Sequence, residues 1–299
     1  MGQELAKQYA VAREVFEEVD AALGQNLSQI MWEGPKETLT LTENAQPALM
    51  AVSMAVMRVL EREHGFKLAD KVKFVAGHSL GEYSALAAAG AFSLADAARL
   101  LKLRGQAMQA AVPVGQGAMS ALLGVGIDVA RKVAEEAAQG DVCQVANDNE
   151  PTQVVLSGAK VAIDRVPDIG KAHGVRRAVP LPVSAPFHCA LMQPAAEAMR
   201  EALAGVTVNA PAVPVVANVL AAPISDPDEI RKRLVEQVTG TVRWRECVAY
   251  MAGNGITDVY EIGSGKVLAG LAKRIDGNLN AMSIGTPADF EAALARLSS

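Results

Sequence analysis

The chain has 299 residues, of which 51% are apolar and 4% aromatic, and its formal net charge is −5. This charge argues against a nucleic-acid-binding protein, and no apolar run is long enough to span a membrane. Neither a signal peptide nor a zinc or disulfide pattern of cysteines is present, so the composition predicts a cytoplasmic enzyme without a metal site.

Hydrophobic periodicity predicts that helices dominate the first third of the chain. Pro47 is expected to open the second of them, at the position that proline tolerates best. Ser93 and Asp96 form a capping box ahead of the fourth. The predicted elements are helices over 3–23, 47–63, 80–91 and 95–111 and a short apolar strand over 72–76.

The pattern of predicted helices and strands changes after Pro113. Two helical segments, 128–139 and 161–174, alternate with about four short strands, which is the βαββαβ order of a ferredoxin-like unit. We therefore expect residues 115–187 to be an inserted subdomain. Beyond it, the pattern predicts helices over 190–204 and from Lys266, with strands over 213–219 and 258–263.

The run G-H-S-L-G at 77–81 lies between a predicted strand and a predicted helix. It matches the G-x-S-x-G nucleophile elbow, in which a sharp turn flanked by Gly77 and Gly81 exposes the hydroxyl of Ser79 at a helix N-terminus. The backbone N–H of Leu80 is then available as an oxyanion donor. The alternative is a glycine-flanked turn whose serine only caps the helix.

A nucleophilic serine needs a general base, and the chain has four histidines. We favour His188, because it lies between a strand and a helix where the insert rejoins the rest of the chain, and such a junction can form a cleft wall. We interpret His64 as a surface residue, His78 as packing beside the nucleophile and His173 as the end of a helix. No carboxylate stands out as a partner for His188, so a triad and a dyad held by a backbone carbonyl both remain open.

Arg104 lies in a strongly apolar helix, 25 residues after the candidate nucleophile. An arginine in this setting can extend its charge to the surface. It can also be a buried guanidinium that binds a substrate carboxylate through two parallel hydrogen bonds.

Together these motifs resemble the malonyl-CoA:acyl carrier protein transacylase family of dissociated fatty acid synthesis, along the whole chain. The resemblance implies an α/β fold in which a large α/β-hydrolase-like domain, 1–114 and 188–299, carries the ferredoxin-like insert. The segments that carry it are TENAQPALMAVSMAV, GHSLGEYSAL, LLKLRGQAMQAAVP, SAPFHCALM, QVTGTVRW and EIGSGKVLAGL.

The resemblance also implies residue roles. Ser79 would be the nucleophile and His188 its base, held by main-chain oxygens of which one belongs to Gln237. Arg104 would bind the free malonyl carboxylate, and the Leu80 N–H would stabilise the oxyanion.

Three further residues carry weaker implications. Phe187 is similar to the bulky residue associated with malonyl rather than α-branched substrates. Asn147 and Asn149 match a substrate-side Asn-x-Asn loop.

The implied reaction is ping-pong transfer of a malonyl group from malonyl-CoA, through an acyl-enzyme, to the phosphopantetheine thiol of acyl carrier protein. No cofactor is expected, since the CoA thioester is a substrate, and we expect a monomer. A basic rim would face the acidic carrier protein, with candidates Arg176, Arg177, Lys266, Lys273 and Arg274.

One segment departs from the family pattern. Family members begin with a short strand and a Phe-Pro-Gly-Gln-Gly-like loop that supplies a second oxyanion group from a glutamine, whereas this sequence begins at the helix that follows. Either its start has been placed late or the segment is absent. We expect reduced activity of this chain, because loss of one oxyanion donor lowers turnover by about 10² to 10³.

Two other classes remain as alternatives. An esterase-type serine hydrolase uses the same elbow, with a triad acid and no charge clamp, and its acyl-enzyme is unstable in water. A binding or scaffold protein would bind the carrier protein without turnover.

Overall fold

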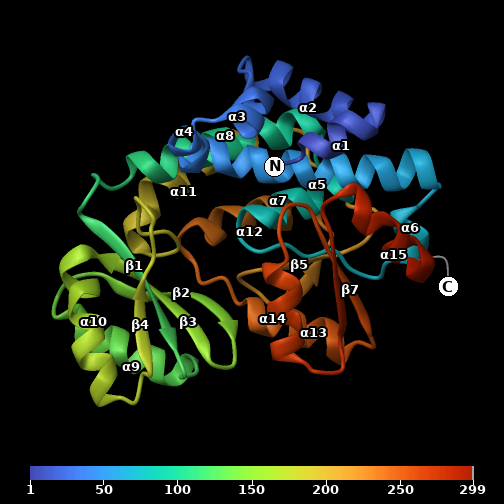
Figure 1. Cartoon of the computed structure of the whole chain (residues 1–299). Coiled ribbons are helices and arrows are strands. Elements are labelled where there is room, and N and C mark those ends of the chain that lie inside the picture. Colours follow the sequence, from blue (N-terminus) through green and yellow to red (C-terminus); the bar gives the residue numbers. More distant parts are fainter. Residues whose placement is uncertain (298–299) are drawn as a thin grey trace.

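The first third of the chain is helical. Its helices are α1 (Gln3–Gln8), α2 (Ala10–Leu23), α3 (Leu27–Glu33), α4 (Lys36–Thr40), α5 (Thr42–His64), α6 (Leu68–Lys71), α7 (Leu80–Ala88) and α8 (Leu94–Ala110). In this computed structural model, which describes residues 1–297, the long helices α2, α5 and α8 lie side by side across the top of the molecule (Figure 1). They share one core that includes Phe16, Val52 and Leu101, as expected for amphipathic helices.

The helix boundaries differ from the prediction at two places. The helix expected over 3–23 is interrupted at Tyr9, whose backbone is extended. The second long helix starts at Thr42 rather than at Pro47, because the N–H groups of Asn44 and Ala45 already bond to the carbonyl of Leu41. Pro47 therefore lies inside the helix, in its second turn, where it lacks the N–H that would bond to the carbonyl of Glu43.

The capping box ahead of α8 is confirmed. The Oγ of Ser93 accepts a hydrogen bond of 3.0 Å from the N–H of Asp96, and the helix begins at the next residue, Leu94.

Residues 115–187 contain a small lobe built on a four-stranded antiparallel sheet. Its elements are β1 (Gly117–Leu123), α9 (Ile127–Ala138), β2 (Cys143–Glu150), β3 (Gln153–Ala159), α10 (Lys160–Ala172) and β4 (Arg177–Pro180). The strand order is β2-β3-β1-β4, and the two helices pack on the sheet around Leu122 and Leu156. The predicted βαββαβ order is therefore confirmed, while the division of the chain into two domains stays a prediction.

The last third returns to the helical layer and adds short strands. Its elements are η1 (Ala190–Met192), α11 (Gln193–Ala204), β5 (Val215–Ala217), β6 (Ala222–Ile224), α12 (Pro227–Thr239), α13 (Trp244–Gly253), β7 (Asp258–Ile262), α14 (Val267–Ile275), β8 (Asn280–Ile284) and α15 (Pro287–Leu297). Strands β5 and β6 are antiparallel, and β7 and β8 are parallel. None of the helices among residues 1–297 combines the length and apolarity that crossing a lipid bilayer requires.

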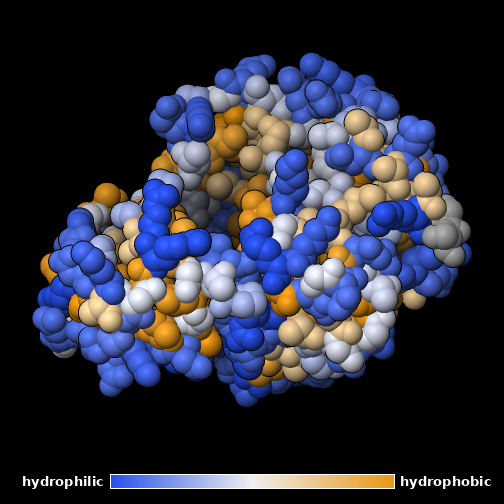
Figure 2. Space-filling model, turned by 60° about the horizontal axis from the view of Figure 1, so that its bottom comes forward, coloured by the Kyte–Doolittle hydropathy of each residue, from blue (hydrophilic) through white to orange (hydrophobic). Residues whose placement is uncertain are grey.

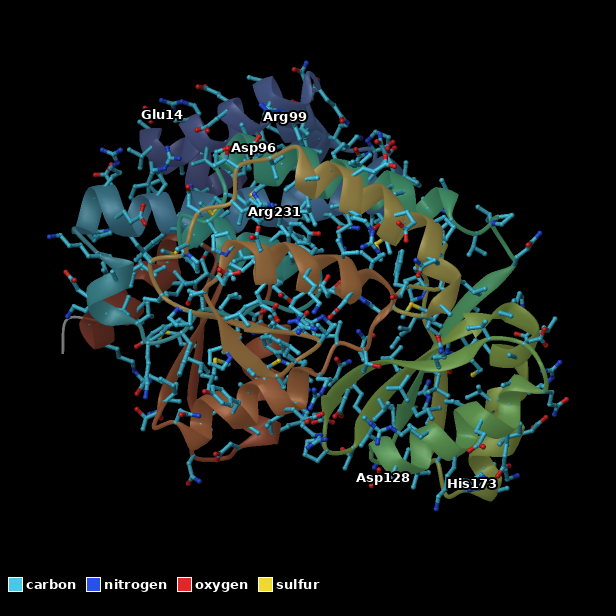
Figure 3. All side chains as sticks on the ribbon, turned by 180° about the vertical axis from the view of Figure 1, so that it is seen from behind. Glu14, Asp96, Arg99, Asp128, His173 and Arg231 are labelled. Atoms are coloured by element: carbon cyan, nitrogen blue, oxygen red, sulfur yellow. The ribbon has the colours of Figure 1, made fainter. Side chains whose placement is uncertain are left out.

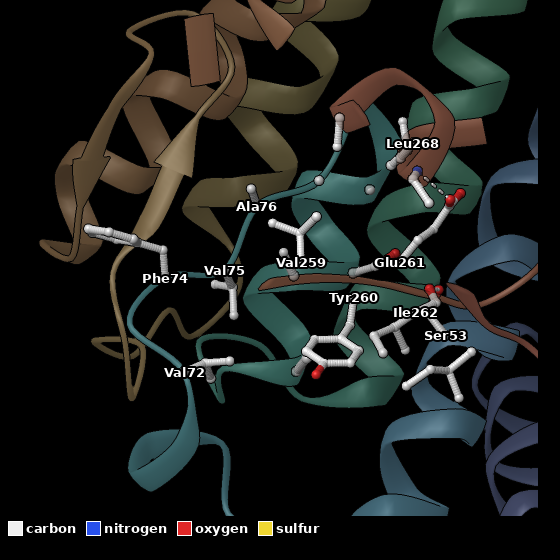
Figure 4. A pocket seen from close by; sticks show the side chains of 18 of the residues that line it. Ser53, Val72, Phe74, Val75, Ala76, Val259, Tyr260, Glu261, Ile262 and Leu268 are labelled. Atoms are coloured by element: carbon white, nitrogen blue, oxygen red, sulfur yellow. Dashed lines mark hydrogen bonds between the residues drawn. The ribbon is translucent and has the colours of Figure 1, made fainter. Parts of the chain in front are cut away.

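The strand predicted over 72–76 is wrong in its extent. The segment is extended, but its ladder is a single parallel bridge between Val75 and Val215. On its other side lies a cavity of about 970 Å³, and across this cavity stand Val259 and Tyr260 of β7 (Figure 4). A regular strand needs hydrogen-bonded neighbours along its length, and among residues 1–297 this segment has one neighbour at one point.

Backbone pairing joins the small lobe to the rest of the molecule. The N–H of Asp148 in β2 donates to the carbonyl of Val242 at 2.9 Å, and the N–H of Val242 donates to the carbonyl of Ala146 at 2.8 Å. The buried carboxylate of Asp148 also pairs with Arg245 at 2.8 Å. On the face shown in Figure 2 the molecule is hollowed between this lobe and the remaining part.

Candidate active site

Ser79 occupies a strained turn between the extended segment and α7. Its φ of 53° is rare for a residue with a side chain, and its N–H is held at 2.8 Å by the Oδ1 of Asn218. A Cβ at Gly77 would lie 1.9 Å from the carbonyl oxygen of Gly81, whereas a Cβ at Gly81 would meet nothing within 4 Å. The elbow therefore requires Gly77 for steric reasons and leaves space at Gly81.

His188 reaches Ser79 from the segment just before η1. Its Nε2 lies 2.7 Å from the Oγ of Ser79, and its Nδ1 lies 2.8 Å from the backbone oxygen of Gln237. Gln237 is near the C-terminus of α12, where carbonyl oxygens carry partial negative charge. In this structure a backbone carbonyl thus occupies the place that a carboxylate has in a triad.

Arg104 is 1% exposed, so it does not extend to the surface. Its Nη1 donates to the Oε1 of Gln46 at 2.7 Å. Its Nη2 donates to the Oγ of Ser79 at 3.1 Å and to the Oε1 of Gln237 at 2.9 Å. The arginine therefore lies beside the hydroxyl of Ser79 and is held by the side-chain amides of Gln46 and Gln237.

A glycine next to Arg104 allows this approach. A Cβ at Gly105 would lie 2.4 Å from the Cα of Glu43, so α8 and α5 touch here through backbone atoms. This close contact brings Gln46 of α5 within reach of Arg104 of α8.

The hydrogen bonds fix where the protons lie. The backbone oxygen of Gln237 only accepts, so the Nδ1 of His188 carries the ring proton and donates to it. In a neutral imidazole the Nε2 is then an acceptor, so the Oγ of Ser79 donates to His188 and accepts from Arg104. Burial, and then the charge of Arg104, lower the pKa of His188 to about 3, so the imidazole is neutral and can accept a proton.

The remaining predicted site residues lie nearby. Leu80 is the first residue of α7, and no hydrogen bond described for residues 1–297 uses its N–H. Phe187 is half-buried and contacts both the main core and a cluster on the small sheet.

The two asparagines of the predicted substrate loop are not joined to the serine, histidine and arginine by any hydrogen bond within residues 1–297. The Oδ1 of Asn149 lies 2.8 Å from the Nε2 of His78. Asn147 forms a backbone bridge with Val242.

His64 and His173 match their interpretation, and the contacts of His78 are with Asn149 and Trp244. His78 packs edge-on against Trp244, and His64 is exposed. His173 follows α10, pairs with Glu136 at 2.8 Å, and lies at the outer end of the small lobe in Figure 3.

The proposed rim residues are exposed, and Arg274 pairs with Glu150 at 2.6 Å.

Sequence reasoning missed three residues of the site: Gln46, Glu82 and Asn218. Gln46 lies inside a segment that carried the family resemblance, but its pattern indicated only a helix. Glu82 has the position of an ordinary first-turn acid. Asn218 lies in a short apolar stretch with no motif, so only tertiary structure places it at the elbow.

Chemically, the arrangement offers a serine hydroxyl, a neutral imidazole to remove its proton and a buried cation beside it. This set suits transfer of an acyl group that also carries a negative charge.

Comparison with known proteins agrees with this chemistry. Residues 1–269 match the acyl transferase domain family. The chain is 46% identical over 291 residues to the malonyl CoA-acyl carrier protein transacylase of Escherichia coli strain K12, which covers 97% of this chain and 93% of that protein.

Two solved structures are similar throughout. The acyl-carrier-protein-S-malonyltransferase from Bartonella henselae has a TM-score of 0.97 and 56% identity, covering 100% of this chain and 95% of that chain. A malonyl-transacylase in complex with its type II PKS acyl-carrier protein has a TM-score of 0.95 and 42% identity, covering 99% and 94%. The chain therefore belongs to the acyl transferase domain family and, within it, to the malonyl CoA-acyl carrier protein transacylases.

Proposed function

We propose that the chain transfers a malonyl group from malonyl-CoA to the phosphopantetheine thiol of acyl carrier protein through an acyl-enzyme on Ser79. One observation carries the proposal: the Oγ of Ser79 lies between the Nε2 of His188 and the Nη2 of Arg104. Malonyl thioesters carry a carboxylate that is separated from the reacting carbonyl by a single methylene. A carboxylate bound by Arg104 would therefore bring the thioester carbon to Ser79.

In the first half-reaction, the Oγ of Ser79 attacks the thioester carbon while its proton moves to the Nε2 of His188. The developing oxyanion accepts a hydrogen bond from the N–H of Leu80. The bond from carbon to sulfur then breaks, and the proton on His188 passes to the sulfur of CoA. No cofactor takes part, because CoA is the leaving group of the substrate.

Acylation also changes the hydrogen bonds of Arg104. The ester oxygen that replaces the hydroxyl of Ser79 is a weaker acceptor, so one N–H of the Nη2 group becomes available. The malonyl carboxylate can accept a hydrogen bond from this N–H and another from the second N–H of Nη1. A buried carboxylate without such a partner would pay a large desolvation penalty.

The second half-reaction reverses the first with a different thiol. The phosphopantetheine thiol gives its proton to His188, its sulfur attacks the ester carbon, and the proton returns to the Oγ of Ser79 as the ester bond breaks. The similar malonyl-transacylase solved with its carrier protein supports acyl carrier protein as the acceptor. We propose that the exposed Lys266 and Lys273 contribute to its docking, since carrier proteins are acidic.

The experiment is an incubation with malonyl-CoA alone, followed by intact mass and CoA release, with Ser79→Ala in parallel. We expect one malonyl adduct that persists in water, is absent from the variant, and is discharged by holo-acyl carrier protein. CoA release at a steady rate without a persisting adduct would instead identify an esterase-type hydrolase. Carrier protein binding without any adduct would identify a binding protein.

A further inference from the structure

Glu82 is a buried carboxylate that the proposed reaction does not use. It lies in the first turn of α7, three residues after the nucleophile, and is 1% exposed. An acid in a first helical turn is usually explained by the helix dipole, but that explanation does not require burial. Burying a carboxylate is costly, so its contacts need an account.

Both hydrogen bonds of this carboxylate go to residues that hold the active site. Its Oε2 accepts from the backbone N–H of Asn218 at 3.0 Å and from the Nε2 of Gln237 at 2.8 Å. One oxygen therefore fixes two segments that are distant in sequence.

The side chain of Asn218 forms two hydrogen bonds with the backbone of the strained elbow. Its Oδ1 accepts from the N–H of Ser79, and its Nδ2 donates to the carbonyl of Gly77, both at 2.8 Å. Movement of the Asn218 backbone would loosen both bonds. The Glu82 carboxylate accepts a hydrogen bond from the Asn218 N–H and so restrains this movement.

Gln237 connects the other two reacting side chains. Its backbone oxygen accepts a hydrogen bond from the Nδ1 of His188, and its Oε1 accepts one from Arg104. Its Nε2 faces the Glu82 carboxylate and, at 3.0 Å, the carbonyl of Ser79. If the amide were turned around, its oxygen would face these acceptors and its nitrogen would face Arg104, so Glu82 helps to fix one orientation.

We propose that Glu82 is a positioning residue, whose carboxylate oxygen holds Asn218 and Gln237 and thereby fixes the elbow, the base and the Arg104 clamp relative to one another. The proposal rests on the proposed function, because it assigns Glu82 to that reaction. Glu82 touches no substrate and acts only through the two amide-bearing residues.

The oxygen acceptor, rather than the charge, is the working part in this proposal. Burial raises the pKa of Glu82 to about 7, against the opposing effects of the bonds from Asn218 and Gln237 and the charge of Arg104. A protonated carboxyl still has a carbonyl oxygen that can accept both bonds. Glutamine also offers one such oxygen, whereas alanine offers none.

The test compares Glu82→Ala, Glu82→Gln and the control Ser84→Ala, a buried residue of the same helix, in the full chain. Two rates are measured per folded molecule: inactivation by phenylmethanesulfonyl fluoride, which reports on Ser79 and His188, and acylation by malonyl-CoA relative to acetyl-CoA, which reports on Arg104. We expect Glu82→Ala to lower the inactivation rate by about 10- to 100-fold and to reduce the malonyl preference. Glu82→Gln and Ser84→Ala should stay within about threefold of the parent.

Two results would overturn the proposal. Equal losses in Glu82→Ala and Glu82→Gln would mean that the charge matters instead of the acceptor. Unchanged rates per folded molecule in Glu82→Ala, with lower stability only, would mean that Glu82 is structural. Failure of the proposed function is distinguishable, because the parent would then not be acylated by malonyl-CoA while its reaction with the sulfonyl fluoride would still report on the elbow.

Discussion

Ser79 and His188 meet at 2.7 Å between Oγ and Nε2, and both residues have positive φ angles, 53° and 57°. Such backbone conformations cost on the order of 1–3 kcal/mol each in residues with side chains. Hydrogen bonds to residues elsewhere in the chain hold both: Ser79 bonds to Asn218, and His188 bonds to Gln237. The pair is therefore preorganised at the expense of local strain.

The low pKa of His188 predicts an unusual pH dependence. A base whose pKa is lowered to about 3 stays neutral as the pH falls through the range in which an ordinary histidine takes up a proton. We expect the inactivation rate of Ser79 by phenylmethanesulfonyl fluoride to be nearly constant from about pH 8 to 5. A histidine with the usual pKa of about 6.5 would lose about 30-fold over that range.

Circular dichroism at each pH is the control for unfolding. An acid limb centred near the ordinary histidine value would contradict the prediction. Because the charge of Arg104 is the second cause of the lowered pKa, Arg104→Ala should move any acid limb to higher pH.

The two glycines of the elbow offer a matched pair of substitutions. Gly77→Ala would place a Cβ 1.9 Å from a backbone oxygen, and we expect it to destabilise the fold by about 1–3 kcal/mol and to abolish the adduct on Ser79. Gly81→Ala meets open space within α7 and should be neutral or stabilise by about 0.5–1 kcal/mol. Urea unfolding and intact mass after incubation with malonyl-CoA measure both effects, and equal behaviour of the two variants would refute the steric argument.

Arg104 should determine which acyl group is used. In Arg104→Ala, the malonyl carboxylate loses its charged partner, so we expect kcat/KM for malonyl-CoA to fall by about 10²- to 10³-fold. Acetyl-CoA, which has no carboxylate, should lose less and become relatively favoured. Steady-state kinetics with both thioesters measure the ratio.

Arg99→Ala is the control for this variant. Arg99 lies on the same helix and pairs with Asp96, close beside it in Figure 3. Exposed ion pairs contribute little, so this change should leave the ratio unaltered. A ratio unchanged in Arg104→Ala as well would remove the clamp from the mechanism.

The parts of the site that sequence could predict are those carried by motifs. Ser79 lies in a local pattern, and His188 stands at a junction between predicted elements. Neither pattern shows the backbone strain at these two residues. Neither shows that the chain folds back so that Arg104, 25 residues later, lies beside Ser79. The backbone contact between Gly105 and Glu43, which brings Gln46 within reach of Arg104, arises from the packing of α8 on α5 and has no local pattern either.

Other parts of the structure could not be predicted because they depend on contacts with residues far away in the sequence. The segment 72–76 has the composition of a strand, but a strand also needs hydrogen-bonded neighbours, and in the described part of the chain Val75 alone is paired, with Val215. Glu82 has the sequence position of a surface acid, and its burial follows from Asn218 and Gln237, more than 130 residues away. The small lobe was predictable because its alternation of strands and helices is local.

The raised pKa of Glu82 also makes stability depend on pH in a defined direction. Glu82 binds its proton more tightly in the folded state, where its pKa is about 7, than in the unfolded state at 4.5. Its contribution to the free energy of unfolding is therefore fully present below about pH 4.5 and is lost as the pH rises through about 7. Glu82→Gln has no such proton, so its stability relative to the parent should increase between about pH 4.5 and 7. Urea midpoints of the two proteins at several pH values measure this difference. A difference that stays constant with pH would mean that Glu82 titrates alike in both states, and that its two hydrogen bonds fully offset the cost of burying its charge.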